Sequence, residues 1–436
     1  MALSHAHGAI QWLSADAVST TYVVSGLSFQ PKAMRFYCVG IQSAEGGVTQ
    51  SVSLYRSMGF AVSTTERRAV IGFSNDAGTE AFTGAAARND CVLLTIGTSG
   101  TPNGLLDLSA VASDGFTLIV DDAAPRDITV FWDAWGGTDP SVCVVGDFGE
   151  PAATGLQTYT VTGFTAGATD QVVMFAGVAQ TTAMNTAQSD RDSNFYVGYA
   201  TGPASANNVV VVGNSDALSG NMDTDRYSQT GECVALILAG GGNPDARAKL
   251  NAWVTDGFQL DWIARGETGR RSIFLAIKGG NWTAGSYTIA GNTLDSTATV
   301  SGLSYAPIGL NSLTVGTTAH TAGTSTTNDR FSIGSGSSTS SRRSMGSLDE
   351  NGTATAEIDL SVGYDSILSY PNSSGVLVSA FDIDALTSDG FRIITDLAGG
   401  VANEWQAYLT FGSAAAGGKA FPFQRMGASF QHMLVR

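Results

Sequence analysis

Three stretches of the sequence carry the same turn signal, Ser113-Asp-Gly-Phe116, Thr255-Asp-Gly-Phe258 and Ser388-Asp-Gly-Phe391. Each leads into a short apolar run, such as Thr117-Leu-Ile-Val120 after the first. Asp-Gly pairs favour tight turns between antiparallel strands, because glycine adopts positive φ values without a steric penalty. We therefore expect a tight turn at each site, with the glycine at positive φ and the phenylalanine on the inward face of the next strand.

Two further landmarks recur around these turns. The first is upstream, at Val24-Ser-Gly26, Val161-Thr-Gly163 and Val300-Ser-Gly302. In the second, Ser57-Met-Gly59 and the pair Arg67–Arg68 match Ser332-Ile-Gly334 and the pair Arg342–Arg343, with Asn207–Asn208 at the corresponding place in the middle. Because ordered landmarks at one period mark a repeat architecture, the sequence predicts three tandem copies of one module.

Within each copy, short apolar runs alternate with Gly, Asn, Asp and Ser, which is typical of an antiparallel β-sandwich or jelly roll. We expect an all-β protein of three sandwich repeats of about 135–140 residues. The predicted domains are residues 1–138, 139–280 and 281–412, followed by a C-terminal segment, 413–436. The best helix candidate is Pro244–Trp253.

Composition narrows the partners of this chain of 436 residues. The net charge of −16 disfavours direct contact with nucleic acid or anionic lipid. No apolar window is long enough to span a membrane as a helix, and the N-terminus shows no signal peptide. The four cysteines have no CxxC spacing, and we expect them to be small buried side chains in strands, as in a reducing cytosol; a Cys38–Cys91 or Cys143–Cys233 bridge is the alternative. They are Cys38, Cys91, Cys143 and Cys233.

Residues for catalysis or metal binding are few. None of the four histidines recurs between copies: His5 and His7 suggest a mobile N-terminal arm, while His320 and His432 lie in a polar loop and in the C-terminal segment. The carboxylate pairs Asp121–Asp122, Asp223/Asp225 and Asp382/Asp384 do not align between copies, as a shared glycosidase cleft would require. The run Asp190-x-Asp192-x-Asn194 only begins like a calcium loop. We expect no enzymatic activity, no cofactor and no metal site.

Two groups of residues are candidates for protein–protein contact. The paired arginines, on a predicted strand edge, could bind carboxylates of a neighbouring subunit or an acidic glycan, or simply keep the edge from aggregating. The aromatic residues and methionines of the C-terminal segment could insert into a partner. The candidate interface residues are Arg67, Arg68, Arg342, Arg343, Phe421, Phe423, Met426, Phe430 and Met433. Trp135 and Trp282 are expected in loops, where they could be exposed.

Triplicated β modules with Ser/Thr-Asp-Gly-Phe turns, few lysines and no catalytic set resemble virion structural proteins of tailed bacteriophages. The resemblance is one of style over the whole chain and assigns no site to any residue. It implies a non-enzymatic part of the particle, such as a capsid decoration, tail or fibre protein, made in the host cytoplasm. Its partners would be other virion proteins and further copies of itself. The alternative is a lectin-like adhesin that binds glycans of the host surface.

Overall fold

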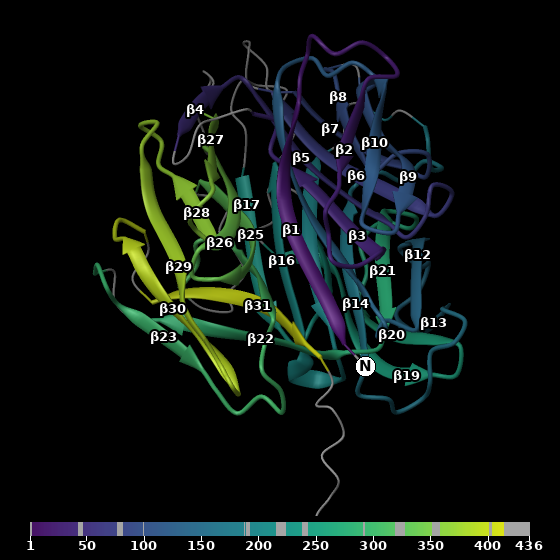
Figure 1. Cartoon of the computed structure of the whole chain (residues 1–436). Helices are drawn as coiled ribbons and strands as arrows, with labels where there is room; N and C mark the ends of the chain where they lie inside the picture. The colour runs from purple at the N-terminus through teal and green to yellow at the C-terminus, as the bar shows by residue number, and fades with distance from the viewer. Residues whose placement is uncertain are drawn as a thin grey trace, which may run out of the picture.

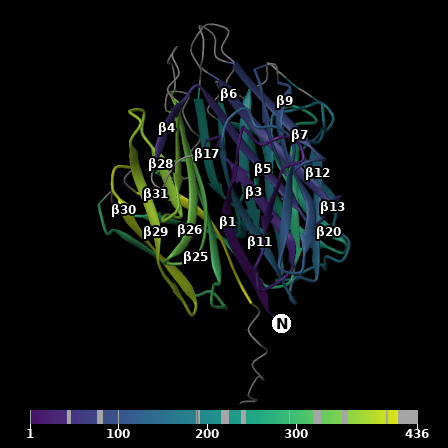
Figure 2. The same ribbon diagram turned by 45° about the horizontal axis from the view of Figure 1, so that its top comes forward.

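The computed structural model (Figures 1 and 2) describes residues 2–413 except 42–46, 76–81, 99, 187, 189–191, 215–223, 238–242, 291–292, 319–327, 351–357 and 401–402. It consists almost entirely of antiparallel β-strands, so the all-β prediction is confirmed. Among the described residues, the single helix is a short 3-10 turn, η1 (Ala204–Ala206).

The helix predicted at Pro244–Trp253 is wrong, because this segment forms strand β19 (Pro244–Val254). Ala246, Ala248 and Leu250 are buried, whereas Arg247 and Lys249 between them are not. This alternation has the period of two that a strand with one buried face requires.

The strands form three sets, each with one large and one small sheet, and the strand order is the same in all three. The first set has a large sheet in the order β1 (Leu3–Trp12), β11 (Ile128–Gly137), β3 (Pro31–Cys38), β5 (Ser53–Ala61), β6 (Arg67–Asn75) and β7 (Phe82–Arg88). Its small sheet has the order β2 (Thr21–Val24), β10 (Gly115–Asp122), β9 (Pro102–Ala112) and β8 (Leu93–Ile96).

The second and third sets repeat this order. The large sheet of the second set is β12 (Val142–Gly149), β21 (Arg271–Lys278), β14 (Gln171–Val178), β15 (Ser193–Ala200), β16 (Asn207–Asn214) and β17 (Thr224–Thr230). Its small sheet is β13 (Gly155–Thr160), β20 (Gly257–Ala264), β19 and β18 (Val234–Ile237). The large sheet of the third set is β22 (Asn281–Ile289), β31 (Glu404–Gly412), β24 (Gly309–Thr314), β25 (Asp329–Ser338), β26 (Ser341–Asp349) and β27 (Ile358–Gly363), extended by β4 (Val48–Ser51) from the first set. Its small sheet is β23 (Thr297–Val300), β30 (Gly390–Leu397), β29 (Leu377–Thr387) and β28 (Leu368–Pro371).

The predicted boundaries after residues 138 and 280 fall between the sets, although β4 from the first predicted domain pairs with β27 of the third set. The division into domains stays a prediction. Within the second set, the two sheets share one apolar core, in which Phe175 and Phe274 of the large sheet pack edge-on against Phe258 of the small sheet. This is the arrangement of a β-sandwich.

The Asp-Gly-Phe turns are tight, as predicted, because Gly115 pairs directly with Ala112 across a two-residue connection. The prediction of a positive φ at these glycines is wrong. Glycine is required here for space: a Cβ on Gly115 would collide with the carbonyl oxygen of Val24. Positive φ values occur instead at the upstream landmark, such as 80° at Gly26, whose amide donates to the Asp114 carboxylate (3.3 Å). The two landmarks therefore meet in space.

The three sets lie around a common core (Figures 1 and 2). In this core, Phe331 of β25 contacts Phe195 of β15, with ring centroids 5.5 Å apart, and the Arg56 guanidinium of β5. Gly59, Gly198 and Gly334 occupy the same place in these strands, since a Cβ on each would collide with the carbonyl oxygen of the facing small-sheet segment. Counting from these glycines gives equivalent trios of side chains. They are Arg56, Phe195 and Phe331; Met58, Val197 and Ile333; and Phe60, Tyr199 and Ser335. We call this region the central junction.

The last strand of each large sheet, not counting β4, is contacted by a segment from the next set, which we call a clasp. On β7, the Ala87 carbonyl accepts a hydrogen bond from the backbone amide of Asn185 (2.9 Å), and the Ala87 backbone amide donates to the side-chain oxygen of Gln180. On β17, Ser228 bonds Thr317 (2.9 Å). On β27, the clasp is the paired strand β4, which comes from the first set. The clasps run from the second set to the first, from the third to the second and from the first to the third, so they close a ring.

Candidate functional site

The predicted arginine pairs do not lie on strand edges, because β6 and β26 are each flanked by strands on both sides. Arg67 donates to both carboxylate oxygens of Asp107, with a distance of 2.6 Å for the longer bond, and to the Asp90 carbonyl (3.1 Å). Since Arg67 lies on β6 and Asp107 on β9, the pair ties the two sheets of the first sandwich together. We call such a pair a staple.

The third set has the same staple at an offset of 275 residues. Arg342 pairs with Asp382 of β29 and donates to the Asp365 carbonyl (2.7 Å). Burial, opposed by the charge of Arg342 and reinforced by the nearby carboxylate of Asp396, raises the pKa of Asp382 to about 7. The second set has a neutral equivalent, in which Asn207 accepts from the Leu250 amide (3.1 Å).

The second arginine of each pair lies at the boundary between sets. Arg68 reaches Asp147 on β12 of the second set (2.6 Å). Arg343 donates to the Tyr364 carbonyl (2.8 Å) and lies over the Tyr364 ring, which packs against Phe131 of the first set. These side chains are therefore engaged within the chain; whether they also contact another protein stays a prediction. The predicted contact residues of the C-terminal segment, from Phe421 to Met433, lie outside the described residues.

A charged network occupies one end of the central junction. Buried Arg35 of β3 donates to Asp133 of β11 (2.6 and 3.0 Å) and to the Tyr199 hydroxyl of the second set (2.9 Å). Asp133 also accepts from His5 Nε2 (3.0 Å) and from Ser335 of the third set. One ion pair thus connects all three sets.

Burial and the Arg35–Asp133 ion pair shift the pKa values of the titratable groups in this network. Burial favours the neutral form of Asp133, but the Arg35 charge and the His5 hydrogen bond outweigh it, so the Asp133 pKa lies below its usual value. Burial, reinforced by His5, lowers the pKa of His7 to about 4. His7 is therefore neutral near pH 7 and donates from Nε2 to the Ser341 carbonyl of the third set (3.1 Å).

A second charged network lies at the other end of the three central strands. Arg56 of the first set binds Asp329 of the third through two hydrogen bonds (2.5 and 2.9 Å) and donates to Asn214 of the second (3.2 Å). Asp349 accepts from Asn214 (2.5 Å) and from Ser74 of the first set (2.8 Å). Here too, the polar side chains join sets rather than open into a cleft.

The structure corrects two predictions about the N-terminal and aromatic residues. His5 and His7 do not belong to a mobile arm; they lie in β1, at the central junction. Trp135 and Trp282 are buried in β11 and β22 with their ring centroids 6.2 Å apart, so they join the first set to the third. Both errors arise because a partner distant in sequence covers a segment that looks polar or loop-like locally.

The four cysteines are unpaired, so neither of the two alternative bridges forms; Cys143 is partly exposed and the other three are buried. Within the described ranges, no three His, Cys, Asp or Glu side chains gather as a metal site. Of the calcium candidates, Asp190 is outside these ranges, and Asn194 accepts from the Ile237 amide (2.7 Å). Of the carboxylate pairs, Asp223 lies outside the described residues and Asp384 pairs with Arg392.

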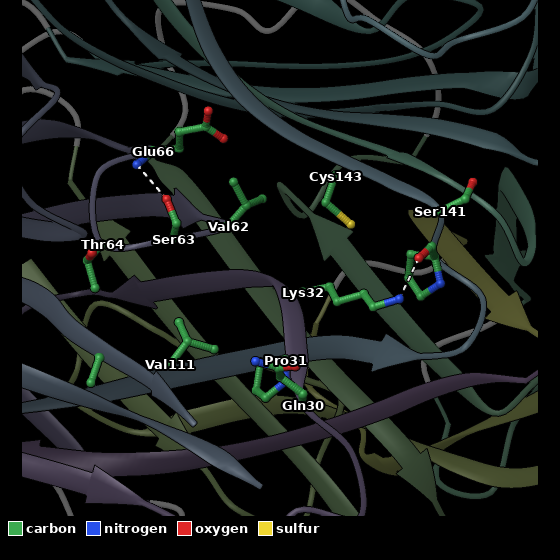
Figure 3. A pocket seen from close by; sticks show the side chains of 12 residues that line it. Gln30, Pro31, Lys32, Val62, Ser63, Thr64, Glu66, Val111, Ser141 and Cys143 are labelled. Atoms are coloured by element: carbon green, nitrogen blue, oxygen red, sulfur yellow. Dashed lines mark hydrogen bonds between the residues drawn. The ribbon is translucent and has the colours of Figure 1, made fainter. Parts of the chain in front are cut away.

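Two grooves lie at corresponding places between neighbouring sets. The first, of about 760 Å³, separates the β5–β6 connection from the start of β12; Figure 3 shows Ser63 and Thr64 on one side and Lys32 and Ser141 on the other. The Lys32 ammonium donates to the Pro140 carbonyl (2.8 Å). The second groove, of about 510 Å³, separates the β15–β16 connection from the start of β22 and is lined by two tryptophans, Trp253 and Trp282.

The sequence contained a signal for the staples that a search for motifs misses. At the offset that relates the arginine pairs, Asp90, Asp107 and Asp121 match Asp365, Asp382 and Asp396. Repeated charges of opposite sign at one offset indicate a repeated ion pair. No comparable signal marks Arg35 or Arg56, because neither recurs in the other sets.

No helix in the described part of the chain is long and apolar enough to cross a membrane. Comparison with known protein families finds no match, and a search of curated proteins finds no significant relative.

Proposed function

We propose that this chain is a non-enzymatic structural protein of a tailed-phage particle, a capsid decoration or a tail or fibre component. The observation that carries the proposal is the closed ring of three like strand sets, held by three clasps and two buried charged networks. A block of this kind presents fixed surfaces to neighbours without needing a partner to order it.

The burial of the phenylalanines that mark the three turns favours a scaffold over a protein with an exposed binding face. Phe116, Phe258 and Phe391, the phenylalanines of the three turns, are each at most 1% exposed. They stabilise the sandwiches instead of forming an aromatic platform. Of the repeated arginines, Arg67 and Arg342 are likewise used in staples within a sandwich, and Arg68 and Arg343 at the boundary between sets.

The surfaces left for partners are the outer faces of the small sheets and the C-terminal segment. Apolar side chains stand exposed on these faces, including Val23 (68%), Leu156 (55%) and Ile263 (39%). Apolar area buried against another virion protein, or against a further copy of this chain, stabilises a contact by about 25 cal/mol per Å². The predicted aromatic anchor, residues 421–433, would add to this contact.

Immunogold labelling tests the proposal. Antibodies raised against the recombinant chain should label phage particles purified from a host that expresses this gene, at regular positions on the head or tail. Particles made with the chain truncated after Ser413 should carry less label if the C-terminal segment is the anchor. Complete particles that show no label would refute the structural role.

The two grooves between sets favour a second candidate function, the lectin-like adhesin. Hydroxyl groups line both grooves, Gln30 adds a side-chain amide to the first, and two tryptophans line the second, a combination that can bind sugars. A glycan array probed with the purified chain tests this alternative. Retention of a defined glycan, lost on substitution of Thr169 or Ser63, would support it, whereas a blank array would leave the assembly role.

A further inference from the structure

The second groove lies beside the place where the described chain ends. Asn281 at the start of β22 donates from its side-chain amide to the Ser413 carbonyl (2.8 Å), and Ser413 donates to the Leu3 carbonyl (3.3 Å). Thr283, which lines the groove, is two residues further along β22 and on the same face as Asn281. Because two residues of a strand span about 7 Å, the groove begins close to Ser413.

The lining of this groove suits an aromatic segment. Trp253 and Trp282 line it together with small residues such as Ala168 and Ala252, around a volume of about 510 Å³. Aromatic rings pair favourably with tryptophan in edge-on or offset geometry, by about 0.5–1.5 kcal/mol beyond the area that they bury.

The sequence after Ser413 provides such a segment at a suitable distance. Seven residues, 414–420 (Ala-Ala-Ala-Gly-Gly-Lys-Ala), precede Phe421-Pro422-Phe423. Seven residues can span up to about 25 Å, which is more than the groove requires. Proline also holds the preceding residue in an extended conformation, which suits a peptide laid along a groove.

We propose that the groove between the second and third strand sets is the docking site of Phe421-Pro422-Phe423 from the same chain. The short tether gives this segment a local concentration in the millimolar range, so that it outcompetes the same segment of another copy. The inference does not rest on the proposed function. Were that function correct, the docked segment would be the resting state from which the anchor is released to a partner.

Peptide binding tests the docking. A fluorescein-labelled peptide, Gly418–Met426, is titrated by anisotropy into the full chain and into the chain truncated after Ser413. We expect micromolar affinity for the truncated chain and at least about tenfold weaker apparent affinity for the full chain, whose groove is already filled. A peptide with Phe421→Ala and Phe423→Ala, and a second peptide of residues 429–436, should bind at least about tenfold more weakly than the first.

Variants of the truncated chain locate the site. Thr169→Arg places a large side chain at an exposed position of the groove lining and should weaken binding of the peptide at least about tenfold. Thr158→Arg, on the exposed face of β13 and outside the groove, is the matched control and should leave binding unchanged. Thr283→Arg serves as a second groove variant, and thermal melts verify that all variants fold.

Each other outcome overturns the proposal. Equal binding to the full and truncated chains would show that the groove is empty in the full chain. Equal effects of Thr169→Arg and Thr158→Arg would place the peptide elsewhere, and no binding to the truncated chain would remove the docking site. Oligomers that form with rising concentration only when residues 414–436 are present would assign the segment to another copy. Immunogold labelling is unaffected by these outcomes, so the two proposals can fail separately.

Discussion

The arginines of the central junction and those of the staples differ in burial and in repetition. Arg35 and Arg56 are at most 1% exposed, and each belongs to a network that joins three strand sets. Arg67 and Arg342 have side chains 17% and 13% exposed and tie the two sheets of one sandwich. The staples recur at one offset, whereas the place of Arg56 is taken by Phe195 and Phe331 in the other sets.

This difference separates two tasks. A repeated ion pair stabilises every sandwich in the same way, so it does not distinguish one set from another. The unrepeated Arg56–Asp329 pair can form in only one arrangement of the sets. Arg56 belongs to the first set, and its partners Asp329 and Asn214 belong to the third and the second set. Buried ion pairs add little net stability but cost much when half of the pair is missing, which makes them suited to fixing one arrangement.

Breaking the central pair should have the largest effect. Asp329→Ala leaves the Arg56 guanidinium buried without its carboxylate, and we expect the free energy of unfolding to fall by about 3–5 kcal/mol. Urea denaturation followed by tryptophan fluorescence measures it. The double variant Arg56→Met/Asp329→Ala should recover most of the loss; no recovery would show that the charge is not the cause.

The pH dependence of the free energy of unfolding should reveal the titration of His7, which lies at the same junction. With a folded-state pKa near 4 and an unfolded value of 6.5, the folded state binds fewer protons in this window. Stability should therefore fall as pH drops from 6.5 to 4, by about 3 kcal/mol from this group. His7→Gln keeps a donor for the Ser341 carbonyl and should flatten that part of the curve. Parallel curves for the two proteins would contradict the assignment.

The staples should cost less to remove. Arg67→Ala and Arg342→Ala should each lower the free energy of unfolding by about 1–2 kcal/mol, since a partly exposed charged hydrogen bond is screened by solvent. Asn207→Ala in the second set should cost a similar amount, because it leaves the buried Leu250 amide unbonded. Raising the salt concentration should diminish the two arginine effects and not the asparagine effect; equal salt dependence would remove the distinction.

The smallest effect is expected at an ion pair that serves neither task. Arg392 and Asp384 pair on the outer face of the third small sheet, where the Arg392 side chain is 49% exposed. Arg392→Ala should change the free energy of unfolding by less than about 1 kcal/mol. A loss as large as that of Arg342→Ala would show that exposure does not rank these pairs.

The sequence sufficed for features that depend on local pattern. It predicted the β class, the tight turns and the buried phenylalanines, because turn chemistry and strand alternation are written within a few residues. It failed where contacts between segments distant in sequence determine the conformation or the burial of a residue. The apolar period of β19 was hidden by its charged outer face, the Gly115 requirement comes from Val24, and His5 is buried only because the third set covers it.

The strand β4 has a consequence for the order in which the protein assembles. Residues 48–51 leave the ribosome early, yet the strand they pair with, 358–361, is made only near the end of synthesis. The first set can therefore fold while the partner of β4 is still missing, and β27 has an unpaired edge until the two meet. Such edges are the parts of β proteins that aggregate. Pairing of β4 with β27 closes the ring and removes this edge as a site where another newly made chain could pair.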